Sequence, residues 1–348
     1  MDDGFRNDTP AREAPRIVDV ARVAGVSTAT VSRVLSHPER VTAKTRANVL
    51  AAVAQTGYRV NLAARNLRRR QTGGIIVLVP YLANPFFSLI LAGIARVAST
   101  AGMNVLVVDT QEPKAANRHI VDYLDANRAD GLIVLDGMLS PGIFSGPRRP
   151  PVLFACEWID GDDHIAVTVD NGRGAEMAVE HLAALGHTAI GYLSGPPANV
   201  LTRQRVAGAR KALAAAGLRV EPRWQLEGDF RLASGIEGAR RWMALDERPT
   251  AVFCFSDAMA FGFVSEINRH GFRVPEDVSV MGFDDIDISA HFIPPLTTIR
   301  QPRTEIGETA AQLLLDMIRP LRNARPPASV TLPIELVVRG STAPPRRS

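Results

Sequence analysis

The chain has 348 residues, more than one compact domain usually holds, and its composition is that of a soluble globular protein. Hydrophobic residues make up 46% and charged residues 22%, but no apolar run approaches the ~20 residues that a membrane span needs. The first 15 residues are polar and contain proline, without the apolar core of a secretory signal. We therefore expect a cytoplasmic protein of more than one domain with no membrane partner.

Positive charge is concentrated at the amino-terminal end. Residues 1–74 contain thirteen Arg or Lys and six Asp or Glu, a net charge of +7. Because the whole chain carries +4, residues 75–348 carry −3. A basic module joined to a mildly acidic body is expected where one module contacts phosphate. A charge run by itself is usually only a solvated surface.

Residues 16–35 have the spacing of a helix-turn-helix. Apolar residues recur at helical spacing up to Gly25, which supplies a turn between two steeply packed helices. Ser27 is placed to cap the second helix. The outward face of that helix carries Thr28, Ala29, Ser32 and Arg33. Small side chains permit close approach to the major groove, and arginine can pair with guanine. The alternative is an ordinary helical hairpin in a globular core.

A third helix and a linker complete this head. Thr42 is placed to cap a helix that ends near Thr56, and Lys44 at its start can hold a backbone phosphate. Residues 61–67 have helical propensity but are too short to form a helix alone in water. Three arginines and Thr72-Gly-Gly follow, which indicates a boundary. We expect this segment to fold only on DNA and against a second copy; the alternative is a plain charged linker.

From Gly74 onward, short apolar runs alternate with amphipathic stretches of helical length. The runs are 75–79, 105–108, 132–135, 152–155, 189–193, 251–255 and 278–281, and the stretches are 86–101, 114–126, 171–185, 203–216, 232–245 and 258–270. This alternation predicts an α/β body of parallel strands with crossover helices. Interruptions near 157–170 and 294–302 predict two doubly wound lobes, in which a ligand binds beyond the carboxyl ends of the strands.

Aromatic and charged residues follow several of these runs. Rings can cover the apolar CH patches of a sugar-like molecule, while Arg205 and Asp284 can bond its hydroxyl groups. Simpler roles are available to neighbouring residues. Phe87 is as consistent with the core as with a ligand site, Asp257 can cap the helix from Ala258, and Glu157 can be a solvated strand end.

The sequence gives no support for catalysis, a cofactor or a metal site. It contains no GxxxxGK[ST] loop, GxSxG elbow, HExxH or CxxC motif. Cys156 and Cys254 each fall in an apolar run, which favours buried free thiols over a disulfide or a metal pair. The alternative function is a cytoplasmic sugar-binding or sugar-processing protein, such as a carbohydrate kinase, with an incidental basic head. A transport protein is disfavoured by that head and by the absence of a signal peptide.

The chain resembles the lactose/galactose repressor family of bacterial transcription regulators. The head and hinge pattern VARVAGVSTATVSRVL…VTAKTR…GYRVNLAARNLR carries this resemblance, and Val60 departs from it where many members have proline. The similarity extends to about residue 341 through NPFF (84–87), DGLIVLD (130–136), VDNGRGA (169–175), RQRVAGAR (203–210), FCFSDAMAFG (253–262), VPEDVSVMGFDD (274–285), PLTTIRQP (295–302) and ELVVRGS (335–341).

The resemblance implies a periplasmic-binding-protein-like body that dimerises and closes around a small effector. The implied DNA-binding residues are Ser27, Thr28, Ala29, Thr30, Ser32, Arg33, Thr42, Lys44, Asn61, Ala64 and Leu67, with Leu67 wedged into the minor groove. The candidate effector-binding residues are Phe86, Phe87, Trp158, Arg205, Phe230, Ser256 and Asp284. Its partners are then a palindromic double-stranded operator, a sugar or related metabolite, and a second copy of the chain. The end of the chain shows no apolar heptads of the kind that form a helical tetramerisation tail, which favours a homodimer over a tetramer.

The expected organisation follows from these patterns. Residues 1–15 form a tail, 16–59 the helix-turn-helix domain, 60–73 the hinge and linker, and 74–342 the body. Within the body we expect a first lobe of about 74–168 and 298–327, and a second lobe of about 169–297 and 328–342.

Overall fold

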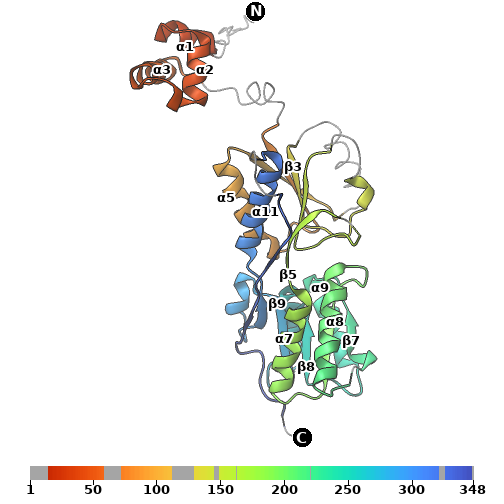
Figure 1. Cartoon of the computed structure of the whole chain (residues 1–348). Helices are drawn as coiled ribbons and strands as arrows, with labels where there is room; N and C mark the ends of the chain where they lie inside the picture. Colours follow the sequence, from red (N-terminus) through yellow and green to blue (C-terminus); the bar gives the residue numbers. More distant parts are fainter. Residues whose placement is uncertain are drawn as a thin grey trace, which may run out of the picture. The chain divides into compact units, whose positions relative to one another are not determined.

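The computed structural model describes residues 15–58, 72–111, 129–144, 149–161, 163–219, 221–320 and 326–346 (Figure 1). Contacts within the chain divide it between Gln71 and Thr72 into an amino-terminal head and a body. The expected body began two residues later, at Gly74. The hinge candidates Asn61, Ala64 and Leu67 lie outside the described residues.

The head consists of three helices, α1 (Ile17–Ala24), α2 (Thr28–Ser36) and α3 (Ala43–Thr56), with a short 3₁₀ turn at Pro38–Arg40. Gly25 ends α1 at a φ of 64°, in the left-handed region that favours glycine. The hydroxyl oxygen of Ser27 accepts a hydrogen bond from the Thr30 amide at 3.1 Å, and that of Thr42 accepts one from the Thr45 amide at 3.3 Å. The expected helix-turn-helix and both caps are therefore confirmed.

The first lobe of the body contains a six-stranded sheet in the order β11-β5-β4-β3-β1-β2. Its strands are β1 (Gly74–Val79), β2 (Asn104–Asp109), β3 (Gly131–Val134), β4 (Val152–Ala155), β5 (Ile165–Val169) and β11 (Val330–Leu332). All of them run parallel. Two helices, α5 (Phe86–Thr100) and α11 (Arg303–Ile318), pack against each other and against this sheet. The helix expected at 114–126 lies outside the described residues.

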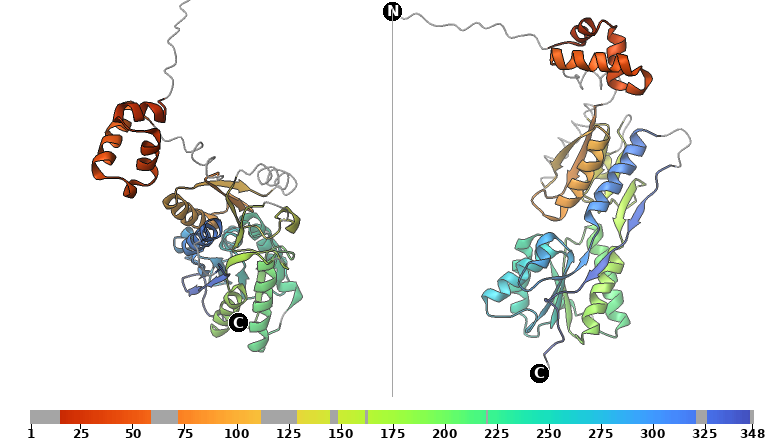
Figure 2. Two further views of the ribbon diagram at one scale, coloured as in Figure 1. Left: turned by 45° about the horizontal axis from the view of Figure 1, so that its top comes forward. Right: turned by 90° about the vertical axis from the view of Figure 1, so that its left-hand side faces the viewer.

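The second lobe repeats this arrangement with the order β12-β10-β9-β8-β6-β7. Its strands are β6 (Ile190–Ser194), β7 (Gln225–Glu227), β8 (Ala251–Cys254), β9 (Ser279–Asp284), β10 (Thr297–Arg300) and β12 (Glu335–Val337), of which only β12 runs antiparallel to its neighbour. Helices α7 (Asn171–Ala184) and α8 (Val200–Ala215) form one packed pair, and α9 (Leu232–Met243) and α10 (Asp257–Arg269) form another. The two pairs cover opposite faces of the sheet (Figure 2).

Three connections join the lobes: β5 to α7, β10 to α11, and β11 to β12. The expected lobe boundaries need two corrections. Residues 298–300 belong to the second lobe, because β10 pairs with β9. Residues 330–332 belong to the first, because β11 pairs with β5 and the chain crosses back only at β12. Short strands at sheet edges carry too little pattern for a sequence to assign them to a lobe.

Glycine allows the helix pairs of the second lobe to approach closely. A Cβ atom on Gly208 of α8 would lie 2.1 Å from the carbonyl oxygen of Gly172 in α7, and one on Gly262 of α10 would lie 2.1 Å from that of Leu232 in α9. Both helix pairs therefore cross where only glycine fits. The expectation of free buried thiols is confirmed for Cys156 and Cys254. No helix in the described ranges combines the length and apolarity needed to cross a membrane.

Candidate functional site

The carboxyl ends of the parallel strands of both sheets converge on one cleft in the body. Its lining includes Pro80 after β1, Thr110 after β2, Asp136 after β3 and Glu157 after β4, all from the first lobe. From the second lobe come Pro196 after β6, Phe230 after β7, Ser256 after β8, Asp284 at the end of β9 and Gln301 after β10. Both sheets have the 2-1-3-4-5 strand order whose switch point is a usual ligand site. The cleft encloses about 260 Å³, near the lower end of ligand pockets, so it suits a small molecule.

Aromatic rings line the cleft from both lobes. Phe86 and Phe87 begin α5, and their rings meet edge to face with centroids 5.1 Å apart. Phe230, in the second lobe, has a φ of 65° and lies with its ring centroid 5.9 Å from the guanidinium carbon of Arg205. Such faces can cover the apolar side of a ring-shaped ligand.

Arg205 is a buried cation in the wall of the cleft. It lies on α8, only 2% exposed, with its guanidinium carbon 3.7 Å from the centroid of the Phe283 ring. Its Nε donates to Oδ1 of Asn171 at 2.9 Å, and Nη1 donates to the carbonyl oxygen of Phe255. Nη2 has no hydrogen bond within the described chain. Burial lowers the pKa of Arg205 to about 10, so it remains charged at neutral pH.

Glu157 is not the solvated strand end that the sequence allowed. The residue is 7% exposed, and its Oε2 accepts hydrogen bonds from the Gly137 amide at 2.8 Å and from Nδ2 of Asn199 at 3.0 Å. Within the described residues Oε1 accepts none, so it is available to a ligand in the cleft. Burial raises the pKa of Glu157 to about 7.

Asp284 faces Arg205 from the end of β9. Oδ1 accepts a hydrogen bond from Nε2 of Gln301 at 2.9 Å, and in the described structure Oδ2 accepts none. Burial raises the pKa of Asp284, which the positive charge of Arg205 partly offsets. Asp136, 6% exposed, accepts hydrogen bonds from the Thr110 hydroxyl and the Met138 amide, and burial raises its pKa as well.

Three contacts between the lobes border the cleft. Besides the Glu157–Asn199 hydrogen bond, Asp160 forms an ion pair with Arg203. The Arg231 guanidinium lies over the Tyr81 ring, 4.5 Å from its centroid. In each contact one partner belongs to the first lobe and the other to the second, so these side chains join the two lobes.

The candidate effector residues can now be compared with the structure. Six of the seven line the cleft: Phe86, Phe87, Arg205, Phe230, Ser256 and Asp284. Trp158 does not line it, because its partly buried side chain packs against the first lobe's second apolar cluster, which includes Phe154 and Ile159. Asp257 does not cap α10 either: Ser256 is the cap, and its oxygen accepts from the Met259 amide at 3.2 Å.

Sequence reasoning missed several polar lining residues. Asp136, Asn199 and Gln301 belong to this group, whereas for Glu157 the sequence left open a ligand-binding carboxylate and a solvated strand end. Asp136 follows directly on an expected strand and Glu157 is the second residue after another, so the strand-end rule contained the signal for both. Asn199 and Gln301 follow a loop or an unrecognised strand and gave no such signal.

The head presents a separate candidate surface. Thr28, Ala29, Ser32 and Arg33 on α2 line one groove together with Ile17 and Val18 of α1. Arg33 is exposed, and no hydrogen bond or ion pair engages its guanidinium within residues 15–58. The Ser27 and Thr30 hydroxyls bond each other at 2.9 Å, and Ser27 also caps α2, so their first role here is local. Thr42 and Lys44 stand exposed at the start of α3.

Comparisons with known proteins match both parts of the chain. The sequence profile described as "Bacterial regulatory proteins, lacI family" matches residues 16–61, and that described as "Periplasmic binding protein-like domain" matches residues 179–342. The "HTH-type transcriptional repressor CytR" of Escherichia coli (strain K12) is 38% identical over 331 residues, covering 94% of this chain and 96% of that protein. The chain belongs to the lacI family of bacterial regulatory proteins.

Further lacI-family proteins agree with this assignment. The "HTH-type transcriptional repressor PurR" of Photobacterium profundum is 36% identical over 314 residues, covering 89% of this chain and 93% of that protein. The solved structure of the lac repressor dimer bound to operator and the anti-inducer ONPF has a TM-score of 0.82 and 34% identity, covering 95% of this chain and all of that one. This lacI-family member is thus a DNA-binding transcriptional repressor and not an enzyme, as the sequence predicted.

Proposed function

We propose that this repressor binds a palindromic operator as a homodimer in the cytoplasm and that a small, uncharged, polyhydroxylated effector in the body cleft controls its affinity for DNA. One observation carries the effector proposal. Three buried side chains in the cleft each have a polar atom without a hydrogen bond in the described structure: Glu157 Oε1, Asp284 Oδ2 and Arg205 Nη2. Two carboxyl oxygens, which accept a hydrogen bond or donate one when protonated, and one guanidinium donor match neighbouring hydroxyl groups.

Charge in the cleft argues against an anionic effector. Four carboxylic acids line it, Asp136, Glu157, Asp229 and Asp284, against the two arginines Arg205 and Arg231. Burial raises the pKa of Asp136, Glu157 and Asp284, which shows that these surroundings disfavour a carboxylate charge, and a sugar acid or a phosphate would bring further negative charge beside them. The aromatic rings of Phe86, Phe87 and Phe230 favour a ligand with an apolar face. Sugars, polyols and nucleosides have this chemistry.

The head supports the operator proposal. The guanidinium of Arg33, which has no partner within residues 15–58, and the short side chains of Thr28 and Ala29 suit base contacts in the major groove, with Ser32 beside them. Lys44 and the amides at the start of α3, capped by Thr42, suit a phosphate. Ser27 and Thr30 fix the first turn of α2, which presents these side chains to the DNA. Asn61, Ala64 and Leu67 are proposed, from the family resemblance alone, to form the hinge that contacts the minor groove.

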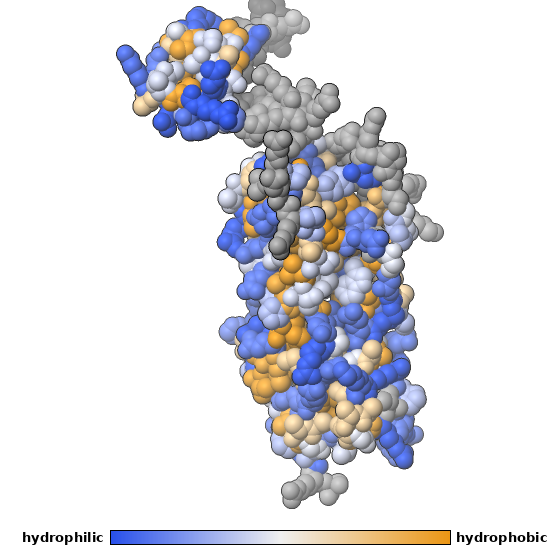
Figure 3. All heavy atoms as spheres, viewed as in Figure 1, coloured by the Kyte–Doolittle hydropathy of each residue, from blue (hydrophilic) through white to orange (hydrophobic). Residues whose placement is uncertain are grey.

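An exposed apolar surface supports the homodimer proposal. Ile288 is 53% exposed, Ile293 84% and Val338 58%, and the chain near Val338 is joined to Pro295 by the Gly340 amide at 2.9 Å. Large apolar side chains at such exposure are typical of a protein interface. Figure 3 shows apolar side chains gathered along one side of the body. The occupant we propose is the same surface of a second copy, as a two-fold dimer requires.

A thermal-unfolding screen of the full chain tests the effector proposal. The panel holds uncharged pentoses, hexoses, disaccharides and nucleosides, each beside its uronic acid or phosphate counterpart. We expect at least one uncharged compound to raise the unfolding temperature and its anionic counterpart to fail. Asp284→Asn should abolish that increase, whereas Asp277→Asn, at an ion pair with Arg346 outside the cleft lining, should keep it. Stabilisation by anionic compounds alone would contradict the proposed effector class.

A further inference from the structure

The first two residues of the body, Thr72 and Gly73, are held by a side chain that lies beside a neighbouring strand. Oδ1 of Asp130 accepts a hydrogen bond from the Thr72 amide at 2.7 Å, and Oδ2 accepts one from the Gly73 amide at 2.8 Å. Asp130 directly precedes β3, whereas Thr72 and Gly73 directly precede β1. Two successive amides therefore converge on one carboxylate, and such charge-assisted bonds are stronger than those between neutral groups.

The pairing of the sheet ends at the residue that follows them. β1 pairs with β2 from Gly74 onward, opposite Asn104, and the Asp130 amide donates to the Gly74 carbonyl oxygen at 2.8 Å. The Gly73 carbonyl oxygen still accepts from the Asn104 amide at 2.8 Å. Gly73 is buried with a φ of 72°, in the left-handed region that favours glycine, and this conformation accompanies the turn of its amide towards Asp130. The carboxylate thus extends the hold of the sheet on the chain by two residues.

This anchor lies where the chain enters the body. The boundary between head and body falls between Gln71 and Thr72, so Asp130 holds the first residues on the body side. Both carboxylate oxygens are occupied by these amides, and no cation pairs with Asp130 in the part of the chain that the structure describes. The anchor is at the amino-terminal edge of the first-lobe sheet, whereas the cleft lies at the carboxyl ends of the strands. Its role is therefore separate from effector binding.

We propose that Asp130 is a positioning residue for operator binding: it fixes the point from which the head is tethered, and so sets how strictly the dimer discriminates between operators whose half-sites are differently spaced. The discrimination rests on the proposed homodimer on a palindrome; the anchor itself does not. Without Asp130, Thr72 and Gly73 would join the tether, and two extended residues add up to about 7 Å of reach. Since the rise of B-DNA is about 3.4 Å per base pair, each head would gain the reach of about two base pairs.

A longer tether has opposite consequences for correctly and incorrectly spaced half-sites. Once one head is bound, the effective concentration of the second head at its own half-site falls as the tether becomes longer and freer. Affinity for the correctly spaced operator therefore decreases. The same freedom lets the second head reach a displaced half-site, so affinity for an altered spacing decreases less or increases. Binding to scrambled DNA depends on phosphate contacts and should change little.

Hydrogen exchange on the full chain tests the anchor without DNA. Mass spectrometry of peptides that begin several residues before Thr72 and end within β1 follows the exchange of the Thr72 and Gly73 amides. We expect these amides to exchange at least about tenfold faster in Asp130→Ala, because opening no longer has to break their bonds to the carboxylate. Parental exchange rates in Asp130→Ala would overturn the anchor.

The other edge of the same sheet offers a matched control. Asp109 is the last residue of β2, and its carboxylate also accepts from two backbone amides, those of Leu82 at 2.9 Å and Gln111 at 2.8 Å. Asp109→Ala therefore removes the same kind and number of hydrogen bonds as Asp130→Ala, but at the edge opposite Thr72. It should leave the exchange of the Thr72 and Gly73 amides as it is in the parent.

Fluorescence anisotropy on a series of duplexes tests the discrimination of spacing. An inverted repeat selected from a randomised library is compared with versions that have one or two base pairs inserted or deleted at its centre. The ratio of the affinity for the selected spacing to that for an altered spacing should fall at least about threefold in Asp130→Ala. Asp109→Ala should keep the parental ratio. If Asp130 only supported folding, both variants would lose stability and neither ratio would change.

Gly73→Ala disturbs the anchor from its other side, because a side chain is strained at a φ of 72° while Asp130 stays in place. It should lower the same ratio even if Asp130→Ala folds poorly. A parental ratio in both variants would overturn the proposal, and so would an equal decrease in Asp109→Ala. If the parent selects no inverted repeat, the proposed palindromic operator fails and the spacing role fails with it, whereas hydrogen exchange still decides whether the anchor exists.

Discussion

Glu157 and Asn199 form a hydrogen bond across the cleft, 3.0 Å between Oε2 and Nδ2, with one residue in each lobe. Asn199 also caps α8 by accepting from the Leu201 amide at 2.8 Å, which fixes the orientation of its side chain. Glu157 is in turn held by the Gly137 amide. The carboxylate that we assign to the effector is therefore also part of the contact that joins the lobes.

Glu157 should make the stability of the protein depend on pH. Its pKa rises from 4.5 to about 7 on folding, because burial disfavours the charged form. The folded protein then binds a proton that the unfolded chain has released, so this contribution to stability is lost as pH rises from about 4.5 to 7. Glu157→Gln has no such proton. Between pH 5 and pH 8 we therefore expect the free energy of unfolding of the parent to fall by about 2–3 kcal/mol relative to that of Glu157→Gln.

Urea unfolding of both proteins across this pH range checks the expectation. Glu237→Gln is a suitable control, because that side chain is 62% exposed on α9 and lies outside the cleft. The control should run parallel to the parent. Parallel curves for Glu157→Gln as well would show that Glu157 is ionised in the folded protein over the whole range.

Asp257 gives a second prediction, on the stability of the second lobe. Replacement by alanine leaves the Ile286 amide and the Ser289 and Thr298 hydroxyls without their buried acceptor. We expect a loss of about 3 kcal/mol in the free energy of unfolding. Asp257→Asn keeps one acceptor oxygen, and its amide can donate to Thr298, so the loss should be near 1 kcal/mol or less, an order-of-magnitude estimate.

The two Asp257 variants should also differ in pH dependence. Burial raises the pKa of Asp257, so the parent loses stability as pH rises above the ordinary range of an aspartate. Asp257→Asn lacks this titration, so the difference between its free energy of unfolding and that of the parent should be most favourable to the variant at high pH. Denaturant unfolding at acidic and neutral pH measures both effects. Equal losses in the alanine and asparagine variants would refute the assignment of these hydrogen bonds.

The elements that the sequence predicted are those whose signal lies in a short stretch of neighbouring residues. Two helix starts were predicted from the caps Ser27 and Thr42, and one helix end was predicted from Gly25. These three boundaries agree with the structure. Buried runs such as 75–79 are continuous enough to be recognised as strands. By contrast, β7, β11 and β12 have three residues each, and they are strands only because a neighbour pairs with them.

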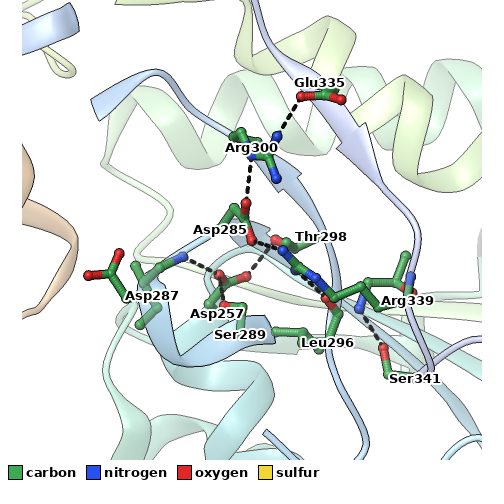
Figure 4. A network of polar contacts seen from close by, with 12 residues as sticks. Asp257, Asp285, Asp287, Ser289, Leu296, Thr298, Arg300, Glu335, Arg339 and Ser341 are labelled. Carbon is green, nitrogen blue, oxygen red and sulfur yellow. Dashed lines mark hydrogen bonds and ion pairs between the residues drawn. The ribbon is translucent and has the colours of Figure 1, made fainter. Parts of the chain in front are cut away.

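The candidate site shows the same division. Arg205 and Asp284 were predictable because their residue types and the family resemblance agreed. Trp158 was misplaced because a side chain after a strand can turn to either side of it, and only packing against the Phe154 cluster decides which. The contacts of Asp285 (Figure 4) could not have been predicted: its partners lie 15, 18 and 54 residues further along the chain, at Arg300, Arg303 and Arg339. The pairing of β9, β10 and β12 in one sheet brings these segments together.

A third prediction concerns the proposed dimer surface. Ile293 is 84% exposed, and its replacement by serine removes apolar area without disturbing the core. We expect Ile293→Ser to weaken dimerisation at least tenfold, equivalent to ~1.4 kcal/mol, with an unchanged unfolding temperature in the monomeric fraction. Sedimentation velocity over a concentration series measures this. Leu106→Ser, at a 44% exposed strand residue outside this surface, is the control and should leave dimerisation intact. A dimer of parental affinity in Ile293→Ser would move the interface elsewhere.

The last prediction separates the two kinds of DNA contact that we assign to the head. Arg33, exposed and unpaired in the described head, is assigned to a base, whereas Lys44 at the start of α3 is assigned to a phosphate. An operator is first selected from a randomised duplex library. Arg33→Ala should then lose about 1–3 kcal/mol on the selected site and much less on scrambled DNA, because only the selected site presents the matching base.

Lys44→Ala should behave differently on the same duplexes. It should weaken both by similar factors and reduce the slope of log affinity against log salt by about one, since one phosphate contact is removed. Fluorescence anisotropy at several salt concentrations measures both variants. Arg22→Ala serves as the control, because that side chain pairs with Asp19 on α1 and lies outside the α2 groove. If Arg33→Ala lost equal affinity for selected and scrambled DNA, its guanidinium would be a phosphate contact, and sequence reading would have to reside in Thr28, Ala29 or the hinge.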